Sequence, residues 1–131
     1  MPVILPDAAT LRVFHDVQLQ RFGGALGLRD PGLLDAAVGR VRTAMGYVDL
    51  DTIETAAMLC HAVLKSHAFV DGNKRTAYGA LVMTLAGAGL RLEADDEAIA
   101  EMILRAAAAP DDHRTIDAWV RTRVVASDED S

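Results

Sequence analysis

The stretch that decides the fold is AAMLCHAVL, residues Ala56–Leu64, which would be apolar over most of the surface of a helix. A helix of that kind is buried on nearly every side, so it belongs in the middle of a domain. The capping sequence Asp51–Glu54 predicts its start, and the apolar pattern runs to about His67. A second segment, residues 73 to 87 or 89, is also apolar nearly all round. The sequence therefore predicts a buried central pair of helices.

Further helices are expected before and after this pair in the sequence. Asp7 is a cap for a first helix that ends at Gly23-Gly24, and Asp30-Pro31 opens a second helix. Two later helices are predicted at about Asp96–Ala108 and Thr115–Val125, after a short extended connector over Leu90–Glu93. The apolar positions of the first two helices are Leu11, Phe14, Val17, Leu19 and Phe22, then Leu33, Leu34, Ala37, Val38 and Val41.

No segment alternates apolar and polar residues over a sustained length, which argues against a sheet-based fold. We therefore expect an all-α domain of about six helices over residues 1–126. Residues 127–131, which are polar, acidic and terminal, are expected to form a disordered tail.

Composition narrows the functional classes. A chain of 131 residues that is 51% hydrophobic can build one sizeable core without disulfides or a structural metal. The formal net charge of −6 argues against general or direct nucleic-acid binding, because no overall positive field would attract phosphates. The single cysteine, Cys60, lies in the apolar run and is interpreted as a buried, inert thiol. We see neither a signal peptide nor a stretch long enough to span a membrane, so a cytoplasmic protein is expected.

Between the two central helices lies the polar segment HAFVDGNKRTA, residues His67–Ala77. It combines an imidazole, a carboxylate, a glycine, an amide and two adjacent cations, and burying such groups is costly unless they serve each other or a ligand. Gly72 next to a helix N-terminus that carries Lys74 and Arg75 is typical of an anion site, for which phosphate is a natural guest. Taken one at a time, however, each of these residues has an ordinary structural explanation as a cap or a solvated charge.

The same segment resembles the signature of the Fic/Doc family, in which a histidine, a phenylalanine, an acidic residue and a small-Asn-x-Arg group keep a fixed spacing. The matching residues of this chain are His67, Phe69, Asp71, Gly72, Asn73 and Arg75. The resemblance continues through Arg21–Gly24, Asp30–Gly32 and Gly39–Val41 and covers most of the chain up to about residue 90. It implies a Fic/Doc-like helical domain.

Two departures from the adenylyl-transferring Fic pattern point to the death-on-curing (Doc) branch. Lys74 stands where Fic enzymes have a second glycine, and Tyr78 stands where they have a second arginine. The resemblance then implies the toxin of a toxin–antitoxin pair, acting as a kinase that moves phosphate from ATP to a hydroxyl of a translation factor, typically elongation factor Tu, and so arrests translation. The alternatives are a Fic-type AMP transferase and a catalytically silent, partner-binding family member.

The resemblance also assigns roles to single residues. His67 would be the general base, Asp71 would bind Mg²⁺, and Gly72 and Asn73 would cradle the phosphates of ATP. Lys74 and Arg75 would bind the nucleotide and neutralise charge on the transferred group. An antitoxin encoded nearby would be the protein partner, its tail folding into a groove on this domain.

Other residues receive less specific predictions. Phe69 is expected to anchor the loop in the core, and His61 to be a satisfied core histidine. His15 and His113 have polar neighbours, so both are expected at the surface. The segment Met45–Leu50 is expected to dock the target peptide, because the fold tends to use that connection.

Overall fold

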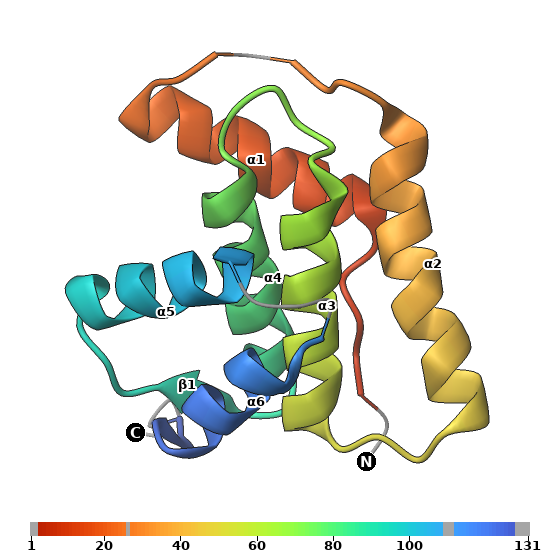
Figure 1. Cartoon of the computed structure of the whole chain (residues 1–131), viewed down its shortest axis with the longest axis vertical. Coiled ribbons are helices and arrows are strands. Elements are labelled where there is room, and N and C mark those ends of the chain that lie inside the picture. The colour runs from red at the N-terminus through yellow and green to blue at the C-terminus, as the bar shows by residue number, and fades with distance from the viewer. Residues whose placement is uncertain (1–2, 26, 109–111, 128–131) are drawn as a thin grey trace.

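The computed structural model describes residues 3–25, 27–108 and 112–127, and six helices and two short strands lie in these ranges. In chain order the elements are α1 (Ala8–Phe22), α2 (Pro31–Tyr47), α3 (Thr52–Ser66), α4 (Asn73–Ala86), β1 (Leu90–Leu92), α5 (Asp96–Ala108), α6 (Arg114–Arg121) and β2 (Val124–Ala126). Figure 1 shows α3 in the centre of the molecule, with α2 on one side and α4, α5 and α6 on the other. The predicted all-α fold is confirmed, and none of the described helices is long and apolar enough to cross a membrane.

The first three helices begin at the predicted aspartates. The side chains of Asp7, Asp30 and Asp51 each accept a hydrogen bond from a backbone N–H of the first turn, at 2.8 Å in all three cases. Each bond satisfies one donor that the helix itself leaves free. Glu54, the last residue of the predicted capping box, pairs instead with His113, whose Nε2 lies 3.1 Å from its carboxylate.

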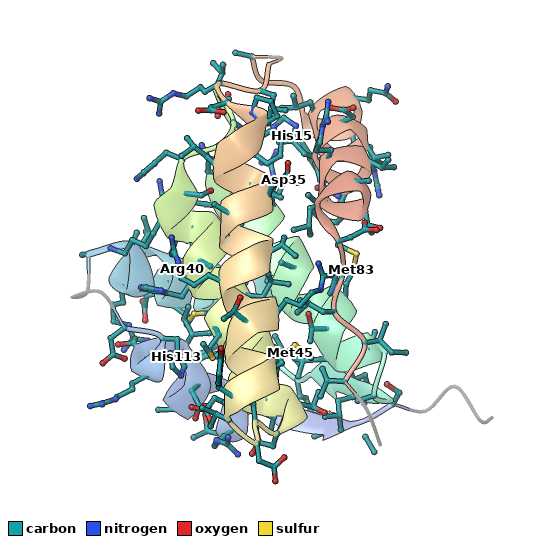
Figure 2. All side chains as sticks on the ribbon, turned by 90° about the vertical axis from the view of Figure 1, so that its right-hand side faces the viewer. His15, Asp35, Arg40, Met45, Met83 and His113 are labelled. Atoms are coloured by element: carbon teal, nitrogen blue, oxygen red, sulfur yellow. The ribbon has the colours of Figure 1, made fainter. Side chains whose placement is uncertain are left out.

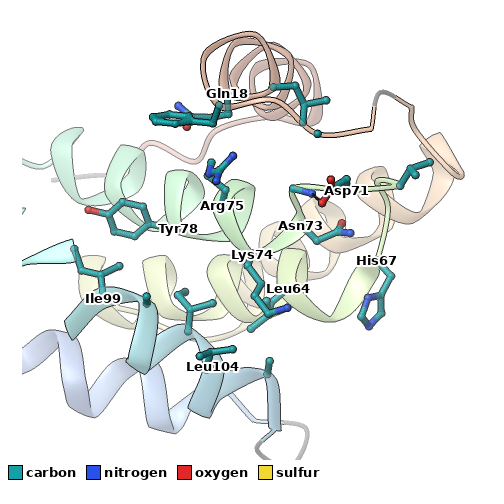
Figure 3. A pocket seen from close by; sticks show the side chains of 18 of the residues that line it. Gln18, Leu64, His67, Asp71, Asn73, Lys74, Arg75, Tyr78, Ile99 and Leu104 are labelled. Carbon is teal, nitrogen blue, oxygen red and sulfur yellow. Dashed lines mark hydrogen bonds between the residues drawn. The ribbon is translucent and has the colours of Figure 1, made fainter. Parts of the chain in front are cut away.

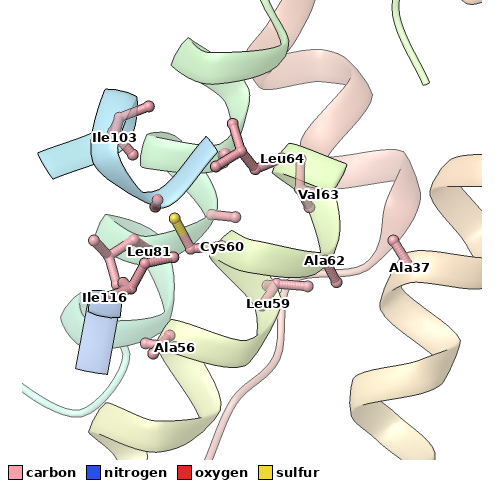
Figure 4. Packing of buried hydrophobic residues seen from close by; sticks show 14 of the residues in the cluster. Ala37, Ala56, Leu59, Cys60, Ala62, Val63, Leu64, Leu81, Ile103 and Ile116 are labelled. Atoms are coloured by element: carbon pink, nitrogen blue, oxygen red, sulfur yellow. The ribbon is translucent and has the colours of Figure 1, made fainter. Parts of the chain in front are cut away.

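The core is built around α3, as its apolar sequence predicts. Figure 4 shows Cys60 of α3 between Leu81 of α4, Ile103 of α5 and Ile116 of α6. Its side chain is fully buried, and this burial raises the pKa of the thiol to about 12. The interpretation of Cys60 as an inert core thiol is therefore confirmed.

Helix α1 lies across α4, and a glycine makes this approach possible. The ring of Phe14 fills the place that a side chain at Gly79 would occupy. On the same side of α1, Leu11, His15 and Leu19 are buried at intervals of four residues. The close contact brings the C-terminal end of α1 over the connection between α3 and α4.

Some sequence predictions need correction. Val17, Phe22 and Leu33, named as apolar positions of the first two helices, are 44%, 60% and 38% exposed. Val17 lies on the outer face of α1, and Phe22, the last residue of the helix, lies against the guanidinium of Arg75 instead of in the core.

The last helix was predicted to reach Val125 but ends at Arg121, because Val124–Ala126 pair as an antiparallel strand with Leu90–Leu92. The backbone N–H of Ser127 still bonds to the carbonyl of Gly89 at 2.9 Å. The rest of the predicted acidic tail, residues 128–131, lies outside the described residues.

Candidate active site

The connection between α3 and α4, residues 67–72, reverses the chain with two residues in the left-handed region. His67 follows the last residue of α3 with φ 49° and ψ 39°, and Gly72 precedes α4 with φ 81° and ψ 15°. A left-handed backbone is uncommon for a residue with a side chain, so His67 is held there by its surroundings. We call this connection the bend.

Asn73 and Phe69 hold the bend from inside. Oδ1 of Asn73 accepts from the backbone N–H of Phe69 at 3.1 Å, and its Nδ2 donates to the Phe69 carbonyl at 2.8 Å. The Phe69 side chain is 3% exposed, which confirms its predicted role as an anchor. The Asn73 side chain therefore shapes the bend, while its backbone N–H remains available at the start of α4.

The connection between α1 and α2 supports the bend from outside. Val70 donates its N–H to the carbonyl of Gly27 at 3.0 Å, and Arg29 donates its N–H to the carbonyl of Ala68 at 2.7 Å. Between these bonds, Leu28 and Phe69 form an isolated antiparallel bridge. Two segments about forty residues apart in sequence thus form one support, although the family signature contains only the second of them.

Asp71 is held as an ionised carboxylate. Its Oδ1 accepts from the N–H of Gly72 at 2.8 Å, and its Oδ2 accepts from the N–H of Ala25 at 3.2 Å. These two bonds, followed by the charge of Arg75, hold the pKa of Asp71 below its usual value. Gly24 makes the approach possible, because a Cβ at this position would lie 2.9 Å from Oδ2 of Asp71.

The start of α4 presents free donors and unpaired cations. Gly72 caps the helix without a side-chain bond, and the backbone N–H groups of residues 73–75 have no partner in the described part of the chain. Lys74 and Arg75 are exposed and form no ion pair with any described residue. The guanidinium of Arg75 lies 4.8 Å from the centre of the Phe22 ring, in a cation–π contact.

A cavity of about 1130 Å³ collects all of the residues predicted for the site. It is lined by His67, Asp71, Gly72, Asn73, Lys74 and Arg75. Its apolar side is formed by residues such as Leu64, Ile99 and Ile103, and Tyr78 also lines it (Figure 3). A polar end with two cations and an apolar side are suited to an anion that carries an apolar or aromatic group.

The imidazole of His67 lies at the edge of this cavity. Figure 3 shows its ring turned away from Asn73 and Arg75, although all three residues line the same space. No described group forms a hydrogen bond with this ring. The fold therefore gathers the predicted residues around one cavity without joining the imidazole to the others.

The described residues contain no cluster of three or more His, Cys, Asp or Glu side chains that would enclose a metal ion. Within the cavity, Asp71 is the carboxylate nearest the free N–H groups of α4, and each of its oxygens keeps one lone pair unused. This donor set fits Mg²⁺ held by one carboxylate together with phosphate oxygens.

The structure corrects the prediction that His15 is a surface residue. Its side chain is 2% exposed, its ring stacks on Phe69, and its Nε2 lies 2.7 Å from the carbonyl oxygen of Asp71. The four-residue spacing from Leu11 and to Leu19 was the signal for burial, because such positions share one face of a helix.

The segment Met45–Leu50, expected to dock the target peptide, lies where α2 leads into α3 but far from the bend, and its docking role stays a prediction. It comprises the last three residues of α2 and the connection that follows, at the end of α3 opposite the bend, and a helix of 15 residues separates the two places by about 22 Å. Figure 2 shows the same separation, with His15 near the top and Met45 in the lower half. The segment that adjoins the bend is instead the connection between α1 and α2.

The other two histidines form hydrogen bonds away from the bend. The Nε2 of His61 accepts from the N–H of Asp112 at 3.1 Å, so His61 is a satisfied, half-buried structural residue, as predicted apart from its depth. His113 is half-buried rather than fully at the surface, because it pairs with Glu54.

Comparison with known proteins agrees with this geometry. A profile of the Fic/DOC family matches residues 6–85, more than half of the chain. The chain is 34% identical over 98 residues to "Protein kinase doc" of Escherichia phage P1, covering 74% of this chain and 77% of that protein. It is 46% identical over 76 residues to "Toxin Doc" of Mycolicibacterium smegmatis, covering 56% of this chain and 58% of that protein. The matched range contains α1, the bend and nearly all of α4, and the chain belongs to the Fic/Doc family.

Proposed function

We propose that this chain is the toxin of a toxin–antitoxin pair, a protein kinase that transfers phosphate from ATP, with Mg²⁺, to a hydroxyl of a translation factor. The observation that carries the proposal is the start of α4, where two cations without carboxylate partners and three free N–H groups line a cavity shared with His67 and Asp71. The names of two relatives, a protein kinase and a toxin, support a kinase toxin over other proteins that bind a phosphate.

The charge balance of the cavity suits a triphosphate. Lys74 and Arg75 offset negative charge on the phosphates, and the N–H groups of the first turn of α4 add directed donors at the positive end of the helix dipole. Mg²⁺ bound to ATP would neutralise charge on the transferred group. Asp71 would hold this ion, since its lowered pKa keeps the carboxylate ionised at neutral pH.

His67 is proposed as the general base that takes the proton of the attacking hydroxyl. It lies at the exposed edge of the cavity, where a protein substrate can reach it. Lys74 fills the position at which Fic enzymes rely on a glycine backbone, and its side chain would change which phosphorus faces the hydroxyl. On this basis we favour transfer of the terminal phosphate over transfer of AMP.

The test uses the purified chain, free of antitoxin, with elongation factor Tu, Mg²⁺ and ATP labelled on either the terminal or the first phosphate. Label from the terminal phosphate on one hydroxyl residue of the factor supports the proposal. Label from the first phosphate would identify an AMP transferase and overturn it. The absence of label from a folded chain, on this factor and on the proteins of a ribosome extract, would favour a silent binding module.

His67→Ala is the matched control. Its side chain is exposed and forms no hydrogen bond with a described group, so the variant should fold normally. We expect phosphate transfer to fall by about 10²–10⁴-fold and growth arrest in cells to disappear. Co-expression with the product of the adjacent gene should restore growth of cells that carry the unaltered chain, if that product is the antitoxin.

A further inference from the structure

His15 is the one titratable residue among the buried polar side chains of the described residues; the others are Thr55, Thr76 and Thr84. It belongs to α1, more than fifty residues before the bend, and it lies outside the segment that carries the family signature. A buried imidazole has a desolvation cost, so its contacts should show what it stabilises.

The ring of His15 touches the bend at three places. It stacks on the ring of Phe69, with centroids 3.7 Å apart and planes at 12°. Its Nε2 lies 2.7 Å from the carbonyl oxygen of Asp71. It also packs on Gly72, where a Cβ would lie 3.2 Å from Cδ2 of the His15 ring.

The bond to Asp71 assigns a hydrogen to one nitrogen of the ring. A carbonyl oxygen only accepts, so Nε2 of His15 must carry the hydrogen. The other ring nitrogen, Nδ1, is buried and has no hydrogen-bond partner, since the nearest carboxylate oxygen, Oδ1 of Asp16, is 3.5 Å away. The firm polar contact of this side chain is therefore the one to the bend.

We propose that His15 is a positioning residue of the active site. Its bond to the Asp71 carbonyl fixes the peptide between Asp71 and Gly72, and so aims the Asp71 carboxylate and the free N–H groups of α4 into the cavity. The same peptide joins the carboxylate to the cap of α4, and a rotation of this unit would move both together. The consequence for catalysis rests on the proposed function, whereas the consequence for the bend does not.

Two variants separate the hydrogen bond from the stacking. His15→Phe keeps an aromatic ring against Phe69 and removes the donor, while His15→Gln keeps an N–H near the position of Nε2 and removes the ring. If His15 only fills the core, His15→Phe is the milder change. If it positions the bend through its donor, His15→Gln is the milder change.

The first readout is hydrogen exchange at the N–H groups of Gly72 and Ala25, both of which bond to the Asp71 carboxylate. Loss of one buried hydrogen bond should raise their exchange about tenfold in His15→Phe and leave it near the unaltered rate in His15→Gln. The second readout is phosphate transfer, for which kcat should fall about tenfold in His15→Phe with little change in KM for ATP, and recover in His15→Gln.

Unchanged exchange in His15→Phe, or an equal increase in both variants, would overturn the proposal. A measurement on the unaltered chain decides the matter if a variant does not fold. Nitrogen NMR of the His15 ring should find the hydrogen on Nε2, and a neutral ring with its hydrogen on Nδ1 would also overturn it. Exchange and ring protonation need no catalysis, so an inactive chain would contradict the proposed function and leave this test valid.

Discussion

Histidine and basic side chains lie near both ends of α3, but they are paired with carboxylates to different extents. At its start, Arg121 donates to Asp51 at 2.9 Å and to Asp117 at 2.7 Å, and His113 lies 3.1 Å from Glu54. At its end, His67 and the cations of the following helix line a cavity and form no ion pair with a carboxylate of the described residues.

This difference separates charges that are paired within the fold from charges that the proposed function assigns to a bound nucleotide. The cations at the start of α3 are neutralised within the fold and tie α6 to the helix cap. Lys74 and Arg75, which are adjacent, repel each other beside the positive end of a helix dipole, an arrangement that disfavours the folded state unless an anion binds. The pairing of charges at the start of α3 therefore fits a structural role, and the lack of ion pairs to described residues at the start of α4 supports the proposed anion site.

The strongest test of this difference is to replace one arginine near each end of α3. If the proposed function holds, Arg75→Ala should lower phosphate transfer by about 10²–10³-fold, because it removes a positive charge that would neutralise the transferred group. Arg121→Ala should leave transfer unchanged and lower the free energy of unfolding by about 0.5–1 kcal/mol, as expected for an exposed ion pair. Kinase assays and urea unfolding of both variants check this, and an equal loss of activity in the two would contradict it.

A substitution at Gly72 should have the next largest effect. Its φ of 81° is unfavourable for a residue with a Cβ, and the added atom would press on the His15 ring. Gly72→Ala should therefore lower the free energy of unfolding by about 1–2 kcal/mol. Gly39→Ala is the control, since Gly39 lies inside α2 with nothing within 4 Å of an added Cβ. That variant should be neutral or slightly stabilising by urea unfolding, and a loss equal to that of Gly72→Ala would exclude backbone conformation as the cause.

The cap of α3 should show a smaller effect on stability alone. Asp51→Ala removes the bond to the Glu54 N–H and the partner of Arg121, and should cost about 1 kcal/mol of unfolding free energy. Asp7→Ala removes a similar cap from α1 that has no such ion pair, and should cost less. Urea unfolding gives both values, and growth arrest by either variant should match that of the unaltered chain. A larger loss in Asp7→Ala would show that the pair with Arg121 adds nothing.

The smallest expected effect is a change in how the free energy of unfolding depends on pH below about pH 4, caused by Asp51. The bond from the Glu54 N–H, followed by Arg121, holds the pKa of Asp51 below its usual value. Because the folded pKa is the lower one, this stabilisation is complete above the unfolded pKa of about 4 and is lost as the pH falls through the folded pKa. Asp51→Asn should therefore flatten the fall in urea midpoint below about pH 4. A slope identical to that of the unaltered chain would remove Asp51 from the acid transition.

Most of the fold could be predicted because its signals are local. The three aspartate caps, the Gly-Gly end of α1 and the apolar surface of α3 act within one or two turns of a helix. The sequence predicts a last helix that is too long, because the apolar residues Val124–Ala126 are compatible with a helix as well as with a strand. Only the distant partner strand, Leu90–Leu92, made the extended form preferable.

The candidate site divides in the same way. The signature predicted the polar residues at one end of the cavity, because the bend and the first turn of α4 are continuous in sequence, but it did not predict the lining from α1, α3 and α5. It did not predict the supports from α1 and the connection after it: His15 under Phe69, and Ala25 and Gly27 bonded to the bend. These contacts join residues more than forty positions apart, and nothing in local sequence specifies such pairings.

The sequence by itself determined the all-α architecture, the buried central pair and the set of polar side chains at its bend, since each follows from local periodicity, capping and a compact motif. Only the tertiary structure decided that His15 is buried, that Met45–Leu50 lies at the far end of α3, and which cations are neutralised. The physical reason is that burial and charge pairing depend on which surfaces meet, and α1 meets α4 through the close approach of Phe14 to Gly79.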